Sequence, residues 1–217
     1  MYDEVLNYLG YKNQIINKDL ENTIKETINE GKKHISEKFV IKKFKFKLKK
    51  DGINLIDNDL DFKSKDLKKH LKDCEEVMII ALSVGFEIER LINMYQTNDM
   101  LKALILDAFA TSYIEKFCDR IQEDVEKTLK PNKKYLTSRF SCGYGDFLLE
   151  EQKKIIKLLD TKKSIGLYLS SSNILTPKKS ITAFIGISDK KTKKLKKCEN
   201  CNLRFTCYLN KEDNSCD

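Results

Sequence analysis

Apolar residues recur at helical spacing in several segments of the chain, and this spacing predicts where its helices lie. The predicted helices span residues 2–9, 17–37, 86–95 and 99–129. Gly10 ends the first of them, and Pro131 follows the last, where proline prevents the helix from continuing. A shorter helix is predicted over residues 66–71, because Ser64 has the side chain of an N-cap.

Other segments show the patterns of β-strands. Phe44, Phe46 and Leu48 alternate with lysines, which predicts a half-exposed strand with a lysine-lined outer face. The continuous apolar run over residues 76–82 predicts a buried strand. Further strands are expected over residues 53–56, 165–169 and 180–188.

The chain has 217 residues and a formal net charge of +8, from 41 lysines and arginines against 33 acidic residues. The arginines are Arg90, Arg120, Arg139 and Arg204. Nucleic-acid sites rely on the planar fork of arginine, so a solvated lysine surface explains this charge better than nucleic-acid binding. No apolar run approaches the roughly 20 residues of a membrane helix, and the N-terminus has no basic-then-apolar leader. We therefore expect a soluble, cytoplasmic protein.

The two histidines contribute little candidate chemistry. His70 lies beside lysines in the helix predicted over residues 66–71, so we expect its ring to be solvated. His34 lies on the polar side of the helix predicted over residues 17–37. Histidine-based catalysis therefore has little support in the sequence.

The seven cysteines fall into two groups. Three are scattered, and the other four crowd the last twenty residues in the pattern C-x2-C-x5-C-x8-C. Two thiolates separated by two residues can share one tetrahedral ion. The candidate ligands for zinc or an iron–sulfur cluster are therefore Cys198, Cys201, Cys207 and Cys216. Reduced thiols that bind no metal are the alternative.

The composition changes at Asp189, where a lysine-rich segment begins. We therefore expect one domain over residues 1–188 and a lysine- and cysteine-rich tail over residues 189–217. Within the domain, residues 1–62 are expected to form a helical and strand part that packs on the rest.

The sequence lacks the motifs of several common enzyme classes. It contains no G-x-G-x-x-G after a strand, no G-x-x-x-x-G-K-[ST], no H-E-x-x-H and no G-x-S-x-G. Hydride-transfer enzymes and hydrolases of the common kinds are therefore disfavoured.

Small residues follow one stripe of the helix predicted over residues 99–129. The stripe consists of Leu104, Ala108, Thr111, Glu115 and Cys118. Small side chains allow a backbone or a ligand to approach closely, and Glu115 is the only charge among them. Its carboxylate either belongs to a site or lies at the border of the buried face.

The stretch R-F-S-C-G-Y-G-D, residues 139–146, is the most informative part of the chain. Two glycines flank Tyr144, which predicts a tight loop. Asp146 is placed to cap the helix that follows. Arg139 stands out because the chain uses so few arginines.

This stretch, with DAFATSYIEKFCDRI upstream and TPKKSITAFIGIS downstream, resembles the activation (S-adenosylmethionine-binding) domain of cobalamin-dependent methionine synthase. It is most similar to the stand-alone form of anaerobic bacteria, and the resemblance covers about residues 5–188. Its strongest motif is R-x-x-x-G-Y. The resemblance implies an α+β fold with a twisted, mainly antiparallel sheet and flanking helices, to which this chain adds the Cys-rich C-terminal tail.

The resemblance also implies a binding site for S-adenosylmethionine. Arg139 matches the ligand-binding arginine, whose guanidinium suits the methionine carboxylate bidentately. Tyr144 matches a tyrosine whose ring favours the positive sulfonium, and Gly143 allows close backbone approach. Ser141 and Cys142 lie between these residues and are included in the expected site.

The resemblance has separate implications for Glu115 and Cys142. Glu115 falls where the family's helix carries an acid that could bind the α-ammonium group. Cys142 stands where the family usually has proline, so the loop should be less rigid here. The thiol of Cys142 is either buried and inert or redox-active.

The implied reaction is the reductive reactivation of methionine synthase, a methyltransferase-type role that requires a partner protein. The expected partner is a cobalamin-dependent methionine synthase that lacks its own activation domain and carries the cobalamin. A flavodoxin- or ferredoxin-type donor would supply one electron. No side chain is expected to act as a catalytic acid or base, because the reaction needs positioning alone.

Two alternatives remain open at this point. The lysine-rich tail and its cysteines could form a zinc-stabilised nucleic-acid-binding module. The chain could also be a partner of a corrinoid protein that performs no chemistry.

Overall fold

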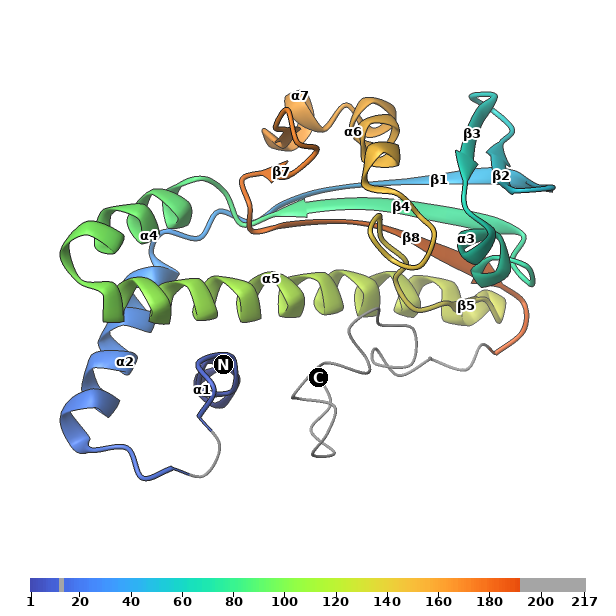
Figure 1. Cartoon of the computed structure of the whole chain (residues 1–217). Coiled ribbons are helices and arrows are strands. Elements are labelled where there is room, and N and C mark those ends of the chain that lie inside the picture. The colour runs from blue at the N-terminus through green and yellow to red at the C-terminus, as the bar shows by residue number, and fades with distance from the viewer. Residues whose placement is uncertain (12–13, 192–217) are drawn as a thin grey trace. The chain divides into compact units, whose positions relative to one another are not determined.

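The computed structural model describes residues 1–11 and 14–191, and Figure 1 shows the course of the chain. The helices are α1 Tyr2–Tyr8, α2 Lys18–Lys32, α3 Lys65–His70, α4 Glu87–Asn98, α5 Met100–Leu129, α6 Gln152–Leu159 and α7 Thr161–Ile165, with 3₁₀ turns η1 Lys130–Asn132 and η2 Leu149–Glu151. The strands are β1 Lys38–Lys49, β2 Gly52–Leu55, β3 Leu60–Lys63, β4 Glu76–Ser83, β5 Tyr135–Leu136, β6 Tyr168–Leu169, β7 Leu175–Thr176 and β8 Ser180–Ser188.

Six strands form an antiparallel sheet in the order β3-β2-β1-β4-β8-β5, and the long strands β1, β4 and β8 lie side by side in Figure 1. The central strand β4 is almost entirely buried, as its continuous apolar run predicts. On β1, Phe44 is buried while Lys45 and Lys47 are exposed, which confirms the lysine-lined outer face. The expected α+β fold with an antiparallel sheet and flanking helices is therefore confirmed.

The chain divides into two compact units that are interleaved in sequence. The first unit comprises Met1–Val40, Ala81–Glu123 and Asp160–Ile181, and the second comprises Ile41–Ile80, Asp124–Leu159 and the residues from Thr182 onward. The long elements β1, β4, α5 and β8 each contribute residues to both units.

In the first unit, α2 and α5 pack closely because α2 carries a glycine at the contact. Gly31 is buried, and a Cβ atom added there would lie 2.9 Å from Leu106 Cδ2 and 2.9 Å from the ring of Phe109. Ile24 and Ile28 on the same helix are buried as well. The helical pattern over residues 17–37 therefore marks a core-facing helix.

The second unit has a core of four phenylalanines, here called the phenylalanine cluster: Phe62, Phe140, Phe147 and Phe184. The rings of Phe62 and Phe184 meet edge to face with centroids 4.9 Å apart, and those of Phe147 and Phe184 with centroids 5.5 Å apart. Such edge-to-face contacts add to the stabilisation that comes from burial. The cluster joins β3, β8 and the loop that follows β5.

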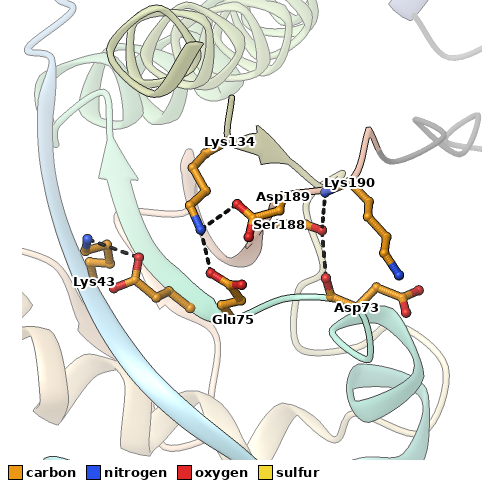
Figure 2. A network of polar contacts seen from close by, with 8 residues as sticks. Lys43, Asp73, Glu75, Lys134, Ser188, Asp189 and Lys190 are labelled. Atoms are coloured by element: carbon orange, nitrogen blue, oxygen red, sulfur yellow. Dashed lines mark hydrogen bonds and ion pairs between the residues drawn. The ribbon is translucent and has the colours of Figure 1, made fainter. Parts of the chain in front are cut away.

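Lys134, which precedes β5, links two segments of the second unit (Figure 2). Its Nζ lies 2.6 Å from Asp189 Oδ1 and also binds the carboxylate of Glu75. Ser188 Oγ donates a hydrogen bond to the carbonyl of Asp73 at 2.7 Å. These contacts hold the end of β8 to the turn that leads into β4.

Two predicted elements differ from the structure. The helix predicted over residues 17–37 ends at Lys32, because the amide of Ser36 donates to the carbonyl of Val84 instead of continuing the helix. The strand predicted over residues 165–169 begins as the end of α7, and Gly166 with φ +70° terminates that helix. Only Tyr168–Leu169 remain extended, as β6.

Among the described residues, none of the helices combines the length and apolar character needed to cross a membrane.

The predicted division at residue 188 stays a prediction, because residues 192–217 lie outside the described part of the chain.

The phenylalanine cluster makes a stability prediction. Phe147 is fully buried, so Phe147→Ala should lower the free energy of unfolding by about 3–5 kcal/mol through lost burial and the cavity left behind. The neighbouring Leu148 is 63% exposed, so Leu148→Ala should change it by less than about 0.5 kcal/mol. Urea unfolding followed by circular dichroism measures both. Equal effects of the two changes would contradict the packing described.

Candidate functional site

The candidate site is the loop of residues 139–147 in the second unit, here called the site loop. Three backbone hydrogen bonds close it into successive tight turns. The amide of Tyr144 donates to Ser141 O at 3.1 Å, the amide of Phe147 to Tyr144 O at 2.9 Å, and the amide of Gly143 to Phe147 O at 2.7 Å. The predicted tight loop is therefore confirmed.

Each glycine of the site loop is required for a different reason. Gly143 has φ +93°, a conformation that residues with a side chain rarely adopt. A Cβ there would meet only Leu149 Cδ2 at 3.7 Å, so the backbone conformation, and not a lack of space, is the reason for glycine. Gly145 has φ +53°, and a Cβ there would lie 2.2 Å from Asp66 Oδ2. Gly145 thus also permits close approach to α3.

The site loop turns its phenylalanines inward and its tyrosine outward. Phe140 and Phe147 are buried in the phenylalanine cluster. Tyr144 is 48% exposed, and its ring meets that of Phe140 edge to face with centroids 5.9 Å apart. The ring of Tyr144 is therefore held from one side and accessible from another.

The site loop is fastened to β8 by a bridge next to Arg139. The amide of Phe140 donates to Phe184 O at 2.9 Å, and the amide of Phe184 donates to Phe140 O at 2.8 Å. Arg139 and Ser141, on either side of Phe140, are each partly exposed. The loop therefore brings Arg139, Ser141, Gly143 and Tyr144 together on one short, anchored segment.

Cys142 is buried, whereas the adjacent Ser141 and Gly143 are partly or fully exposed. Burial, with a further contribution from the charge of Glu151, raises the pKa of the Cys142 thiol to about 12. The thiol is therefore protonated at neutral pH, whereas reactive cysteines need a lowered pKa. The structure supports the buried, inert thiol and not the redox-active one.

The sequence predicts that Asp146 caps the helix that follows it, and this prediction is wrong. Its carboxylate accepts hydrogen bonds from Lys65 N at 2.8 Å and from Asp66 N at 3.1 Å, and also from Ser64 Oγ. It therefore caps α3, 80 residues upstream. The turn η2, which follows the site loop, has no side-chain cap. Ser64 caps α3 through the amide of Leu67, and Asp146 binds the amides of Lys65 and Asp66, which have no partner within the helix.

His70, at the end of α3, is half-buried rather than solvated. Its Nε2 lies 2.9 Å from Ser138 O and 3.0 Å from Thr137 Oγ1, and its ring centroid lies 5.1 Å from that of Phe140. Burial lowers the pKa of His70 and outweighs the hydrogen bond to Ser138, which acts in the opposite direction. No local pattern could have revealed this contact, because its partners lie 67 and 68 residues away.

Glu115 lies on α5 in the first unit, whereas the site loop belongs to the second. Its side chain is partly exposed. On the same stripe, Leu104 is 54% exposed while Ala108 is buried. Lys179 contacts the same helix: its Nζ lies 2.8 Å from Asp107 Oδ1 and donates to Thr111 Oγ1 at 2.7 Å.

The structure does not test the predicted metal site. The candidate ligands Cys198, Cys201, Cys207 and Cys216 all lie outside the described residues. Within residues 1–11 and 14–191, no group of three or more histidines, cysteines, aspartates and glutamates could hold a metal ion. In this part of the chain, Cys74, Cys118 and Cys142 form no disulfide.

Comparisons with known proteins agree with this geometry. The sequence matches the family model of the vitamin B12-dependent methionine synthase activation domain over residues 12–199. A solved structure described as the MetH reactivation domain bound to AdoHcy superposes with a TM-score of 0.64 at 16% sequence identity, covering 89% of this chain and 71% of that chain. The search of curated proteins found no significant match.

At 16% identity the structural likeness shows the fold alone, and the family model, which matches most of the chain, shows the family. The resemblance carried by R-x-x-x-G-Y is thereby confirmed. The chain belongs to the family of the vitamin B12-dependent methionine synthase activation domain.

Proposed function

We propose that the chain binds S-adenosylmethionine through the site loop and supports the reductive methylation of cob(II)alamin on a separate methionine synthase. The observation that carries the proposal is the R-x-x-x-G-Y segment itself, which is anchored by buried phenylalanines while Tyr144 is exposed. Family membership supports the same role. The solved relative was crystallised with AdoHcy, which S-adenosylmethionine becomes when it loses its methyl group.

The donor set of the site loop fits this ligand. The guanidinium of Arg139 can hold the carboxylate of the methionine part through two parallel hydrogen bonds. The exposed ring of Tyr144 can pack against the positive sulfonium. Gly143, which is exposed and lacks a side chain, leaves space for the ligand beside the backbone. Ser141 adds a hydroxyl on the same segment.

The site residues act by positioning. When bound, S-adenosylmethionine supplies the methyl group that, with one electron from a flavodoxin- or ferredoxin-type donor, converts cob(II)alamin to methylcobalamin. The reaction moves no proton, so the chain needs no general acid or base. The protonated Cys142 thiol and the hydrogen-bonded His70 are consistent with that requirement.

Titration calorimetry with S-adenosylmethionine tests the binding site. Arg139→Ala should weaken binding at least about tenfold, because a charged hydrogen-bond pair is lost. Tyr144→Leu should also weaken it, whereas Tyr144→Phe keeps the ring and should retain most of the affinity. Arg90→Ala is the matched control, because Arg90 is exposed and pairs with Glu87 on α4.

Unchanged affinity in Arg139→Ala would contradict the assignment of the site, and absence of binding by the natural sequence at about 1 mM ligand would contradict the function. The same titration tests Glu115, which the resemblance assigns to the α-ammonium group. Glu115→Gln should weaken binding. Its control is Glu123→Gln, an exposed position on the same helix.

A methylation assay separates catalysis from simple partnership. The chain, S-adenosylmethionine and a chemical reductant are added to cob(II)alamin bound to a methionine synthase that lacks its activation domain. The visible spectrum should change to that of methylcobalamin, and Arg139→Ala should slow the change. Ligand binding without methylation would favour the non-catalytic partner. Salt-sensitive RNA or DNA binding that is lost on deletion of residues 190–217 would favour the nucleic-acid-binding module.

We also propose that Cys198, Cys201, Cys207 and Cys216 bind a metal, on the basis of their spacing. Anaerobic reconstitution followed by metal analysis should find bound zinc, or iron and sulfide with visible absorbance. The double change Cys198→Ser and Cys201→Ser should remove the metal, whereas Cys74→Ser should not. A colourless, metal-free protein with full methylation activity would contradict the proposal.

A further inference from the structure

The helix α3 contacts the site loop near both ends of the loop. We propose that α3 holds the loop in the conformation that presents Arg139 and Tyr144, with His70 and Asp146 as positioning residues. The part of this inference that concerns ligand affinity rests on the proposed function. The part that concerns the loop conformation does not.

The first contact joins the C-terminal end of the site loop to the start of α3. Asp146 accepts from the amides of Lys65 and Asp66 and from the hydroxyl of Ser64. In return, Asp66 Oδ2 accepts from the amide of Asp146 at 3.1 Å. Burial opposes ionisation, but these hydrogen bonds outweigh it and hold the pKa of Asp146 below its usual range. The two segments therefore cap each other reciprocally.

The second contact joins the end of α3 to the residues around Arg139. Because a carbonyl can only accept, Nε2 of His70 carries the hydrogen that binds Ser138 O. The ring of His70 also packs against that of Phe140. Arg139 thus lies between two residues that His70 contacts. Thr137 Oγ1, the other neighbour of His70 Nε2, accepts from the amide of Gly186 on β8 at 2.8 Å.

The site loop gains from such support, although three backbone hydrogen bonds close it. It contains two glycines with positive φ, which leave the unbound backbone many alternatives. Cys142 occupies the position where proline would restrict the chain. A long arginine side chain delivers its fork accurately only if its backbone is held, and pre-organisation reduces the entropy lost on binding. The contacts of α3 supply that restraint from outside the loop.

The first measurement follows the motion of the site loop in the absence of ligand. The chain contains no tryptophan, so Tyr144→Trp introduces a single tryptophan in the site loop, which can be excited separately from the tyrosines. Time-resolved anisotropy should show more nanosecond motion when His70→Leu or Asp146→Ala is added. His70→Gln retains an N–H donor at a similar distance and should restore most of the rigidity. His34→Leu, at the other histidine, should change nothing.

The second measurement uses the natural Tyr144. His70→Leu should weaken S-adenosylmethionine binding about tenfold, and His70→Gln should recover most of the loss. In an Arg139→Ala background, His70→Leu should weaken S-adenosylmethionine binding by less than about twofold further, because His70 acts through Arg139. A purely structural role would lower the melting temperature without this dependence on Arg139. If His70→Leu fails to fold, His70→Phe keeps a ring against Phe140 while it removes the donor.

The two inferences can fail separately. Unchanged anisotropy in both His70→Leu and Asp146→Ala would overturn the role of α3, whatever the ligand does. Increased motion in a protein whose natural sequence does not bind S-adenosylmethionine would overturn the proposed function and leave the role of α3 in holding the loop supported. Weaker binding that is equal in the Arg139 and Arg139→Ala backgrounds would overturn the claim that His70 acts through Arg139.

Discussion

The reciprocal pair of backbone hydrogen bonds between Phe140 and Phe184 is the contact on which the candidate site depends. The site loop contains no helix or strand, so this bridge to β8 fixes its position. The buried rings of Phe147 and Phe62 both pack edge to face against the ring of Phe184. Tyr144 can therefore be exposed without the loop leaving the core, since Phe140 before it and Phe147 after it are buried.

The small helix α3 adds a second restraint of a different kind. The phenylalanine cluster holds the site loop by burial, which has little directional preference. The contacts of Asp146 and His70 are hydrogen bonds, whose strength depends on direction and distance. Together they restrict both how deeply the loop sits and how it is turned. This combination of burial and hydrogen bonds suits a site that acts by positioning a ligand rather than by moving protons.

The charge of the chain has a modest role in this arrangement. Lysines such as Lys49 and Lys127 form exposed ion pairs with nearby acids of the second unit, and pairs of this kind contribute little stability. The net charge of +8 is thus mainly a property of the surface. It can steer an acidic partner toward the chain without selecting it. The informative positive charge is the single guanidinium of Arg139.

The sequence by itself determined the family, through R-x-x-x-G-Y and the matching segments on both sides of it. It also determined most of the elements, because periodicity and caps are local signals. It also identified the tight loop from Gly143 and Gly145. Only the tertiary structure decided the roles of Asp146 and His70. Their partners lie 67 to 82 residues away, and a polar side chain in the sequence shows which bonds it can make but not which donor or acceptor folding will bring to it.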